Sequence, residues 1–519
     1  MGSESGRTMK THPLLLGLAC AAAGGRPAAA PAQGPGPGPR MTLSTYLGGA
    51  GEDSVRDVFV DSGGFVYATG GTASADFAAT PGAYAEEFGG VHDAYAVKLD
   101  PDGRVVFATL LGGPEYDRAY AIEVDAEGFV YVAGRAGDDF PTTKGALQRR
   151  FGGDSKPNDL YGKQDGFVCK LSPDGSELVW STYFGGRGRS VLRDLAVDAE
   201  GCVYVVATQV DRKLPHVSKK SFGRKLRGDG DGFVAKISAD GEDLIYGGYL
   251  GGGDFDGGTP SVRVDAAGHA YVLTHTRSDD LPVSENAYQK QPGGDLDLML
   301  VKVAPDGRSL VYCTYFGGSG VEFTETHGLA VDHQGQVVIA ATTRSPDLPA
   351  VAVELEPPFQ PRYGGSGQPG SGARTNYPGD GFVARFSADG STLVGFTYLG
   401  GGAGEGIEGC AVDGEGRVYV SGATFSPDFP LPRETLKPAF GGDSDAFLAR
   451  LSPDLTALEA ATFWGGSGRD EGRSLAVTPE GVVVLCGMTW SGDMQTTPNA
   501  PQPRYRRGEA DGFLLRIDP

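Results

Sequence analysis

One segment recurs along almost the whole chain, and it constrains the fold more than any other feature. Its clearest copy is Asp165–Gly186, DGFVCKLSPDGSELVWSTYFGG, in which two apolar runs of strand length flank the tripeptide Pro173-Asp174-Gly175. Proline presets φ at the second position of a turn and glycine supplies a left-handed conformation, so the segment predicts a β-hairpin. An isolated hairpin is barely stable in water, and this one therefore needs neighbours.

The hairpin occurs seven times. Its first strand begins with Asp at positions Asp93, Asp165, Asp231, Asp297, Asp380, Asp445 and Asp511. Its second strand ends in two large apolar residues followed by Gly-Gly, again in seven copies. A spacing of roughly 65 residues between copies indicates a repeat architecture rather than several unrelated domains.

A second pair of strands lies between successive hairpins. In the second repeat it reads YDRAYAIEVD, then Ala126-Glu127-Gly128, then FVYVAGR. Each repeat thus has four short antiparallel strands, named a to d in chain order. Strands that are apolar on both faces predict a sheet packed between two others, and radially repeated four-stranded sheets make a propeller. We predict an all-β, seven-bladed β-propeller of four-stranded antiparallel blades.

The two ends of the chain are predicted to share one blade. The sequence stops at Ile517-Asp518-Pro519, just after strand c of the seventh repeat, and the missing strand d is supplied by Thr42–Gly49, TLSTYLGG. This pairing would close the ring and remove two open sheet edges, each of which is a site for aggregation.

The repeats resemble a known family. The segments STYLGG, VDxxGxVYVxG, DFPTT and DGFVAKLSPDG are similar to the bacterial β-propeller repeat called SBBP, and the similarity covers nearly all of residues 42–519. Departures are Thr478 in place of the Asp of the Val-Asp pair, Leu455 in place of the turn Gly, and the atypical strand start at Asp297. The resemblance implies a propeller in a secreted or surface-attached bacterial protein, with no general activity.

Three regions are expected along the chain. Residues 1–30 have a basic start, a short apolar run and small residues at Ala28-Ala29-Ala30, which predicts a secretory signal peptide. Residues 31–41 are a Pro/Gly-rich linker predicted to be disordered, and residues 42–519 form the propeller. Lipidation at Cys20 is a disfavoured alternative, and no later run is long and apolar enough for a transmembrane segment. The protein is therefore expected to be exported, as a secreted or cell-surface monomer.

Charge and cysteine content narrow the possible partners. The formal net charge of −21 disfavours nucleic acid, which requires clustered Lys and Arg. The one basic cluster is interpreted as a solvated loop; it consists of Lys219, Lys220, Arg224, Lys225 and Arg227. The cysteines after Cys20 are odd in number and scattered, so they are interpreted as buried hydrophobes rather than a disulfide framework.

Binding is assigned to one face of the propeller. The a–b and c–d turns share one face and are tight, whereas the b–c and d–a connections share the other and are long. Functional residues concentrate on loops held by a rigid scaffold, so the b–c/d–a face is the predicted functional face. Its two longest loops, 136–164 and 343–379, carry Tyr161 and Tyr363 as candidate binding residues. The alternative, which is favoured for both loops, is that they are tolerated insertions.

Acidic residues and one histidine complete the candidates. Asp53, Asp117, Asp254 and Asp470 lie in or beside d–a connections, where oxygen ligands suit Ca²⁺. None has a known calcium-loop spacing, so capping or solvated acids are favoured and no cofactor is expected. His327, near Glu322 and Glu325, is predicted close to the axis. Glu322 and His327 are included among the candidate binding residues.

Three functions remain open from the sequence. The favoured one is a non-enzymatic scaffold that binds a protein or glycan partner through its b–c/d–a face. The second is a propeller hydrolase or lyase acting on glycans with carboxylates or His327 at the channel mouth. The third is a purely structural surface module. No catalytic motif such as GxSxG, HExxH or a P-loop occurs, so catalytic residues are not assigned.

Overall fold

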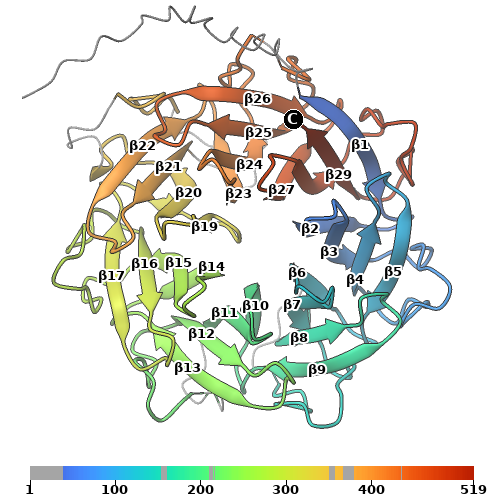
Figure 1. The fold of residues 1–519 in the computed structure, drawn as a ribbon, viewed down its shortest axis with the longest axis horizontal. Coiled ribbons are helices and arrows are strands. Elements are labelled where there is room, and N and C mark those ends of the chain that lie inside the picture. The colour runs from blue at the N-terminus through green and yellow to red at the C-terminus, as the bar shows by residue number, and fades with distance from the viewer. Residues whose placement is uncertain are drawn as a thin grey trace, which may run out of the picture. The chain divides into compact units, whose positions relative to one another are not determined.

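The computed structural model describes residues 39–153, 161–209, 214, 217–349, 357–365, 379–433 and 435–519. Apart from a 3-10 turn at Pro349, the regular secondary structure in these residues is β-strand, arranged in seven antiparallel sheets around a central axis (Figure 1). The predicted seven-bladed propeller is confirmed. The predicted signal peptide and most of the linker lie outside the described residues. No helix able to cross a bilayer occurs in the described part of the chain.

The first four blades have the predicted order of strands from the axis outward. Blade one contains β2 (Asp53–Val60), β3 (Val66–Thr72), β4 (Asp93–Leu99) and β5 (Val105–Leu111). Blade two contains β6 (Arg118–Val124), β7 (Val130–Ala136), β8 (Asp165–Leu171) and β9 (Leu178–Phe184). Blade three contains β10 (Ser190–Val197), β11 (Val203–Gln209), β12 (Asp231–Ile237) and β13 (Leu244–Leu250). Blade four contains β14 (Asp256–Val264), β15 (Ala270–Thr276), β16 (Asp297–Val303) and β17 (Leu310–Phe316).

Blade five departs from this order because its innermost strand is broken in two. It contains β18 (Glu322–Phe323), β19 (Leu329–Val331), β20 (Val337–Thr343), β21 (Asp380–Phe386) and β22 (Leu393–Leu399), with both short strands paired to β20. Blade six contains β23 (Glu405–Val412), β24 (Val418–Thr424), β25 (Asp445–Leu451) and β26 (Leu458–Trp464). Blade seven contains β27 (Asp470–Val477), β28 (Val483–Thr489), β29 (Asp511–Asp518) and β1 (Arg40–Leu47).

The ring closes through the pairing of the two ends of the described chain. Strand β1 forms the outer strand of blade seven and runs antiparallel to β29, with Tyr46 opposite Phe513. The Tyr46 hydroxyl donates to the carbonyl oxygen of Ser491 at 2.9 Å and accepts from the N–H of Met494 at 3.0 Å. The predicted closure is therefore confirmed, and β1 starts at Arg40, two residues before the predicted strand.

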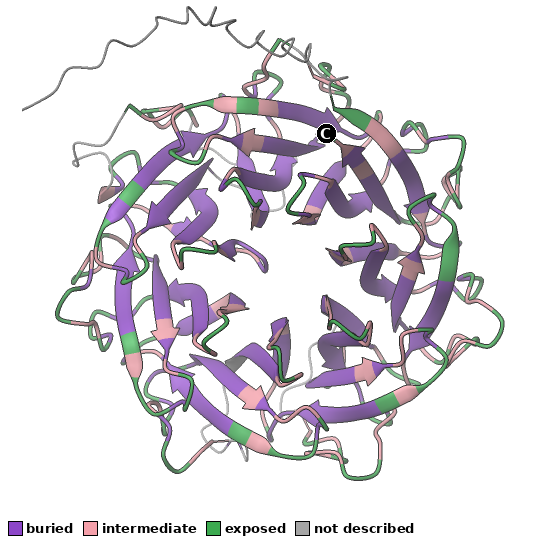
Figure 2. Cartoon of the chain, viewed as in Figure 1, coloured by how far each residue is buried: buried purple, intermediate pink, exposed green. Residues whose placement is uncertain are grey.

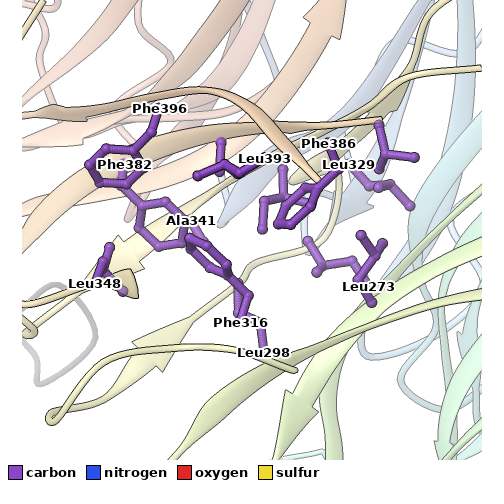
Figure 3. Close-up of a cluster of buried hydrophobic side chains, with 14 of the residues drawn as sticks. Leu273, Leu298, Phe316, Leu329, Ala341, Leu348, Phe382, Phe386, Leu393 and Phe396 are labelled. Carbon is purple, nitrogen blue, oxygen red and sulfur yellow. The ribbon is translucent and has the colours of Figure 1, made fainter. Parts of the chain in front are cut away.

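The hydrophobic core consists of layers between neighbouring blades. Middle strands such as β3, β7 and β20 are buried along their whole length, as their two-sided apolar sequence predicted (Figure 2). Between blades four and five, Leu298 and Phe316 lie in the same cluster as Ala341 and Phe382 (Figure 3). Each sheet thus packs its two faces against its two neighbours, which is the arrangement that defines a propeller.

The b–c loops hold neighbouring blades together. In blade one, the N–H of Tyr84 donates to the carbonyl oxygen of Gly175 in the c–d turn of blade two at 2.9 Å. In blade three, the N–H of Phe222 makes the same bond to Gly307 of blade four at 3.1 Å. Asn499 of blade seven donates to Asp102 of blade one at 2.8 Å, across the closure. These loops therefore contribute to the stability of the ring in addition to forming part of one face.

Candidate functional site

The side chains on the axis come from one repeated irregularity. In five blades the ladder between strands a and b skips one residue, which makes a β-bulge at Arg56, Tyr120, Arg193, Glu408 and Arg473. A bulge redirects the side chain that it carries. All five side chains line one cavity of about 20 Å³ on the axis, which we call the arginine chamber.

Blade five contributes a loop instead of a bulge. The stretch from the first glycine after strand d to the Val of the Val-Asp pair is 14 positions in blade five (Gly317 to Val331) and 12 in blade two (Gly112 to Val124). The two extra residues of blade five are accommodated in the loop 324–328 between β18 and β19. Its residues Glu325, Thr326 and His327 complete the lining of the arginine chamber.

His327 lies at the centre of the channel and contacts three other blades. Its Nε2 lies 3.6 Å from Oδ1 of Asp57, and its Nδ1 lies 3.5 Å from Oδ1 of Asp194. Nε2 also lies 3.2 Å from the carbonyl oxygen of Tyr120. Burial alone lowers the pKa of His327, but the two carboxylates outweigh it and raise the pKa above its usual value. The backbone holds φ at 78°, a conformation that is strained for a non-glycine residue.

A second cavity lies on the other side of His327. It has a volume of about 230 Å³ and is lined by the last residues of the innermost strands, next to the a–b turns. We call it the carboxylate chamber, since Asp57, Glu123 and Asp194 line it together with Arg263 and His327. Arg263 pairs with Asp194 at 2.8 Å. Burial raises the pKa of Glu123 to about 8, so this carboxyl group is mostly neutral at pH 7.

Four arginines surround Tyr120, and two of them, Arg56 and Arg193, also line the arginine chamber. The guanidinium carbons of Arg193, Arg135, Arg118 and Arg56 lie 4.7, 5.5, 5.6 and 5.9 Å from the centre of its ring. None of the four forms an ion pair with a carboxylate in the described part of the chain, whereas Arg473 pairs with both Glu408 and Glu471. Arg135 is only 2% exposed. Buried cations without an ion-paired carboxylate are costly. Two acids, Glu325 and Glu408, line the chamber together with Arg56 and Arg193.

The arginines and burial both shift the pKa values of the groups around the chamber. Burial raises the pKa of Tyr120, but the arginines outweigh burial and the net pKa lies below that of a free tyrosine. Burial raises the pKa of Glu325 to about 7. Burial lowers the pKa of His92 to about 4, so this imidazole, stacked 4.4 Å from Tyr116, is neutral at pH 7.

The structure places Tyr161 and Tyr363 in different environments. The guanidinium carbon of Arg135 lies 3.8 Å from the ring centre of Tyr161, which also lies 5.0 Å from the ring of Tyr116. Tyr161 thus joins the arginine cluster, together with His327. Tyr363 packs 6.0 Å from Tyr398 against the core between blades four and five, and so contributes to packing there.

The candidate acids sit within the blades, where they bind the b–c loops. Glu322 accepts hydrogen bonds from the hydroxyls of Thr343 and Ser345 at 2.7 and 2.6 Å. Asp53 and Asp470 accept equivalent bonds from Ser74 and Ser491, and Asp117 accepts from the N–H groups of Gly113 and Gly137. Asp254 is exposed. The described residues include no group of three or more His, Cys, Asp or Glu arranged to hold a metal ion.

Sequence reasoning missed most of the axial residues, although a positional signal exists. The position four places before the Val of each Val-Asp or Val-Thr pair carries Arg56, Tyr120, Arg193, Pro260, His327, Glu408 and Arg473, and all of these except Pro260 line the arginine chamber. Five residue types occur at this position, whereas the following Val-Asp or Val-Thr pair hardly varies. Asymmetry at a fixed position of a repeat is the pattern expected for function, and it could have pointed to the site.

The buried acids give the protein a pH-dependent stability. Burial raises the pKa of four of them to about 7: Asp117, Glu322, Glu405 and Asp511. A folded-state pKa above the unfolded value gives stability that is present at low pH and lost as the pH rises through the folded pKa. His92 and His275, with pKa values lowered to about 4, oppose this trend only below about pH 6.5.

We therefore expect the melting temperature to fall between pH 6.5 and pH 8.5, as followed by circular dichroism. Glu405→Gln, which is neutral throughout this range, should show a shallower fall than the wild-type protein. A melting temperature that is constant or rises over this interval would contradict the assignment of these carboxyls as protonated buried acids.

Fold and axial site together define a class of protein, the seven-bladed β-propeller assembled from repeated four-stranded blades. Residues 106–141 match the family model described as SBBP, beta-propeller repeat. This match agrees with the resemblance of the repeats to that family, and the structure has the seven-bladed propeller that the resemblance implied. No curated protein matches it in sequence.

Solved structures show only distant similarity. BamB from Moraxella catarrhalis has 11% identity and a TM-score of 0.35, covering 92% of this chain and 85% of that one. A PL25 polysaccharide lyase, an ulvan lyase bound to -[GlcA(1-4)Rha3S]-, has 11% identity and a TM-score of 0.43 over 88% and 95% of the two chains. The quinohemoprotein alcohol dehydrogenase from Comamonas testosteroni has 10% identity and a TM-score of 0.39 over 92% and 76%. Similarity at this level carries no information about what this chain binds.

Proposed function

We propose that this protein is an exported, non-enzymatic β-propeller that binds an acidic partner, glycan or protein, at the arginine chamber on its b–c/d–a face. The observation that carries the proposal is the set of four guanidinium groups around Tyr120 without carboxylate partners. They stand out in a chain whose formal net charge is −21. An acidic group of the partner would supply the negative charge that the site lacks.

The position of the cluster fits the predicted functional face. Arg118 begins β6 directly after the d–a connection, and Arg135 lies near the end of β7, before the b–c loop. The chamber itself holds about 20 Å³, which is room for about one water molecule. We infer that a carboxylate or sulfate of the partner lies at the mouth of the chamber, while the rest of the partner lies on the loops around it.

Binding is favoured over catalysis by the state of the axial carboxylates. Asp194 is paired with Arg263, and Glu408 is paired with Arg473. The hydrolase or lyase alternative would need carboxylates free to exchange protons with a substrate. These carboxylates are instead engaged in holding the innermost strands together.

The proposal is tested by titrating the protein with oligogalacturonate and with oligoglutamate in a calorimeter. We expect at least one of them to bind, with an affinity that falls as salt rises. Arg56→Gln and Arg193→Gln should each weaken that binding about tenfold, the effect expected for a lost charged hydrogen bond. Arg277→Gln changes an exposed arginine next to β15 and serves as the matched control.

A stability measurement separates a binding role from a structural one. If the arginines bind a ligand, they repel one another in the free protein, and replacing one of them relieves this repulsion. Arg193→Met should then unfold at the same or a higher urea concentration than the wild type. A marked loss of stability, or affinities that do not change in either glutamine variant, would overturn the proposed function.

A further inference from the structure

The seven b–c loops contact their outer strands through one equivalent hydrogen bond, which aligns the loops residue by residue. In each blade the N–H of a large residue of strand d donates to a loop carbonyl oxygen, over 2.9–3.3 Å. From blade one to blade seven, the accepting residues are Ala85, Gln148, Gly223, Gln289, Gln360, Lys437 and Gln502.

Four of these positions carry glutamine, and its carboxamide is used in the same way each time. In blade two, Oε1 of Gln148 accepts from the N–H of Gly185 at 3.0 Å, and its Nε2 donates to the carbonyl oxygen of Arg150 at 3.0 Å. Gln289, Gln360 and Gln502 repeat both bonds. Each carboxamide is thus hydrogen-bonded both to the glycine that follows strand d and to the loop residue two positions after the glutamine.

Blade three lacks this side chain. The equivalent residue is Gly223, and a Cβ atom there would lie 1.9 Å from the carbonyl oxygen of Tyr249, so the backbone leaves no room for a side chain. The two groups that a carboxamide would join are the N–H of Gly251 and the carbonyl oxygen of Lys225. Neither has a hydrogen-bond partner among the described residues.

A cavity occupies the corresponding place. It has a volume of about 380 Å³, and Gly223, Lys225 and Gly251 all line it. Leu250, Met299 and Leu310 form an apolar part of its lining. The volume is in the usual range for a small-ligand site, which is about 300–1,000 Å³.

The rim of the cavity is basic. Lys225, Arg227 and Arg308 line it, and the first two belong to the basic loop that the sequence singles out. Arg227 is held by an ion pair with Asp280 at 2.6 Å, which fixes its guanidinium group beside the carbonyl oxygen of Gly251. A partner whose neighbouring residues are acidic would be attracted to this rim.

We propose that this cavity binds the glutamine side chain of an acidic segment of a partner protein. The carboxamide takes the place that the chain's own glutamine occupies in blades two, four, five and seven. Its oxygen accepts from Gly251, its amide group donates to Lys225, and acidic residues on either side of it face Lys225, Arg227 and Arg308. The inference does not depend on the arginine chamber, which lies on the axis.

The test compares three blocked peptides by calorimetry: Glu-Glu-Gln-Glu-Glu, the same peptide with Glu at the centre, and the same peptide with Met at the centre. The glutamine peptide should bind at least about tenfold more tightly than either, because a carboxylate would face the Lys225 carbonyl oxygen and Met satisfies neither backbone group. Free glutaminamide should bind weakly at the same site and compete with the peptide.

Two matched pairs of variants locate the site. Ser309→Trp would fill the cavity, whereas Thr392→Trp changes the equivalent exposed turn residue of blade five, away from it. Arg308→Glu reverses one rim charge, and Arg104→Glu reverses the residue after the turn glycine of blade one. We expect Ser309→Trp to abolish binding of the glutamine peptide and Arg308→Glu to weaken it several-fold, with neither control affected. The melting temperatures should match within each pair.

The proposal is overturned by any of three results. The first is no binding of the glutamine peptide to the wild-type protein. The second is equal or tighter binding of the all-Glu peptide, which would show a basic patch without carboxamide recognition. The third is binding that survives in the properly folded Ser309→Trp variant, which would place the peptide elsewhere.

Discussion

Deleting residues 1–50 is expected to abolish the folding of the ring as a stable monomer. The deletion removes β1, and with it the outer ladder of blade seven and the buried side chains of Leu43 and Tyr46. Several ladder hydrogen bonds and two large apolar side chains are together worth on the order of 5–10 kcal/mol. This is comparable to the whole stability of a typical protein, about 5–15 kcal/mol.

The matched control is a chain that begins at Pro39 and keeps β1 complete. It should melt cooperatively and remain monomeric in size-exclusion chromatography, whereas the chain that begins at Gly51 should be insoluble or melt far lower. If the two chains melt alike, the pairing of β1 with β29 does not hold the ring closed.

Asp194→Asn is expected to destabilise the protein by about 3–5 kcal/mol, the cost of removing one partner from a buried ion pair. Asp194 faces both Arg263 and His327, and its substitution leaves the Arg263 guanidinium without its partner. The measurement is urea unfolding at pH 7, followed by tryptophan fluorescence and circular dichroism.

Asp306→Asn provides the comparison, because Asp306 pairs with Arg308 in an exposed turn at 3.7 Å. Exposed pairs of this kind contribute about 0–1 kcal/mol, so this variant should unfold close to the wild type. Equal effects of the two substitutions would show that the axial charges do not behave as a buried network.

The fold could be predicted from the sequence because its determinants are local and repeated. The Pro-Asp-Gly turns specify hairpins, and the two-sided apolar strands specify sheets packed on both faces. The seventh blade was predictable for the same reason, since TLSTYLGG at residues 42–49 is the outer strand that the last repeat lacks. Each of these inferences uses only the residues within one turn or strand, or the number of repeats in the chain.

The site was only partly predictable, because its contacts join blades that are far apart in the chain. His327 was a candidate, but its position between Asp57 and Asp194 depends on the ring bringing blades one, three and five together. The cluster of four arginines around Tyr120 depends in part on the bulges that turn Arg56, Tyr120 and Arg193 toward the axis. The pattern of hydrophobic residues does not specify the direction of a bulged side chain.

The shared seventh blade has a consequence for the synthesis of the protein. Strand β1 leaves the ribosome before the other strands of the ring, whereas its partner β29 is the last of these strands to be made. At about 5–20 residues per second, β1 waits for tens of seconds with its pairing edge uncovered. During that time β1 can pair with β29 of another molecule, so slow translation or crowded expression should favour strand-exchanged dimers. A chaperone that covers β1 until β29 has been made would suppress them.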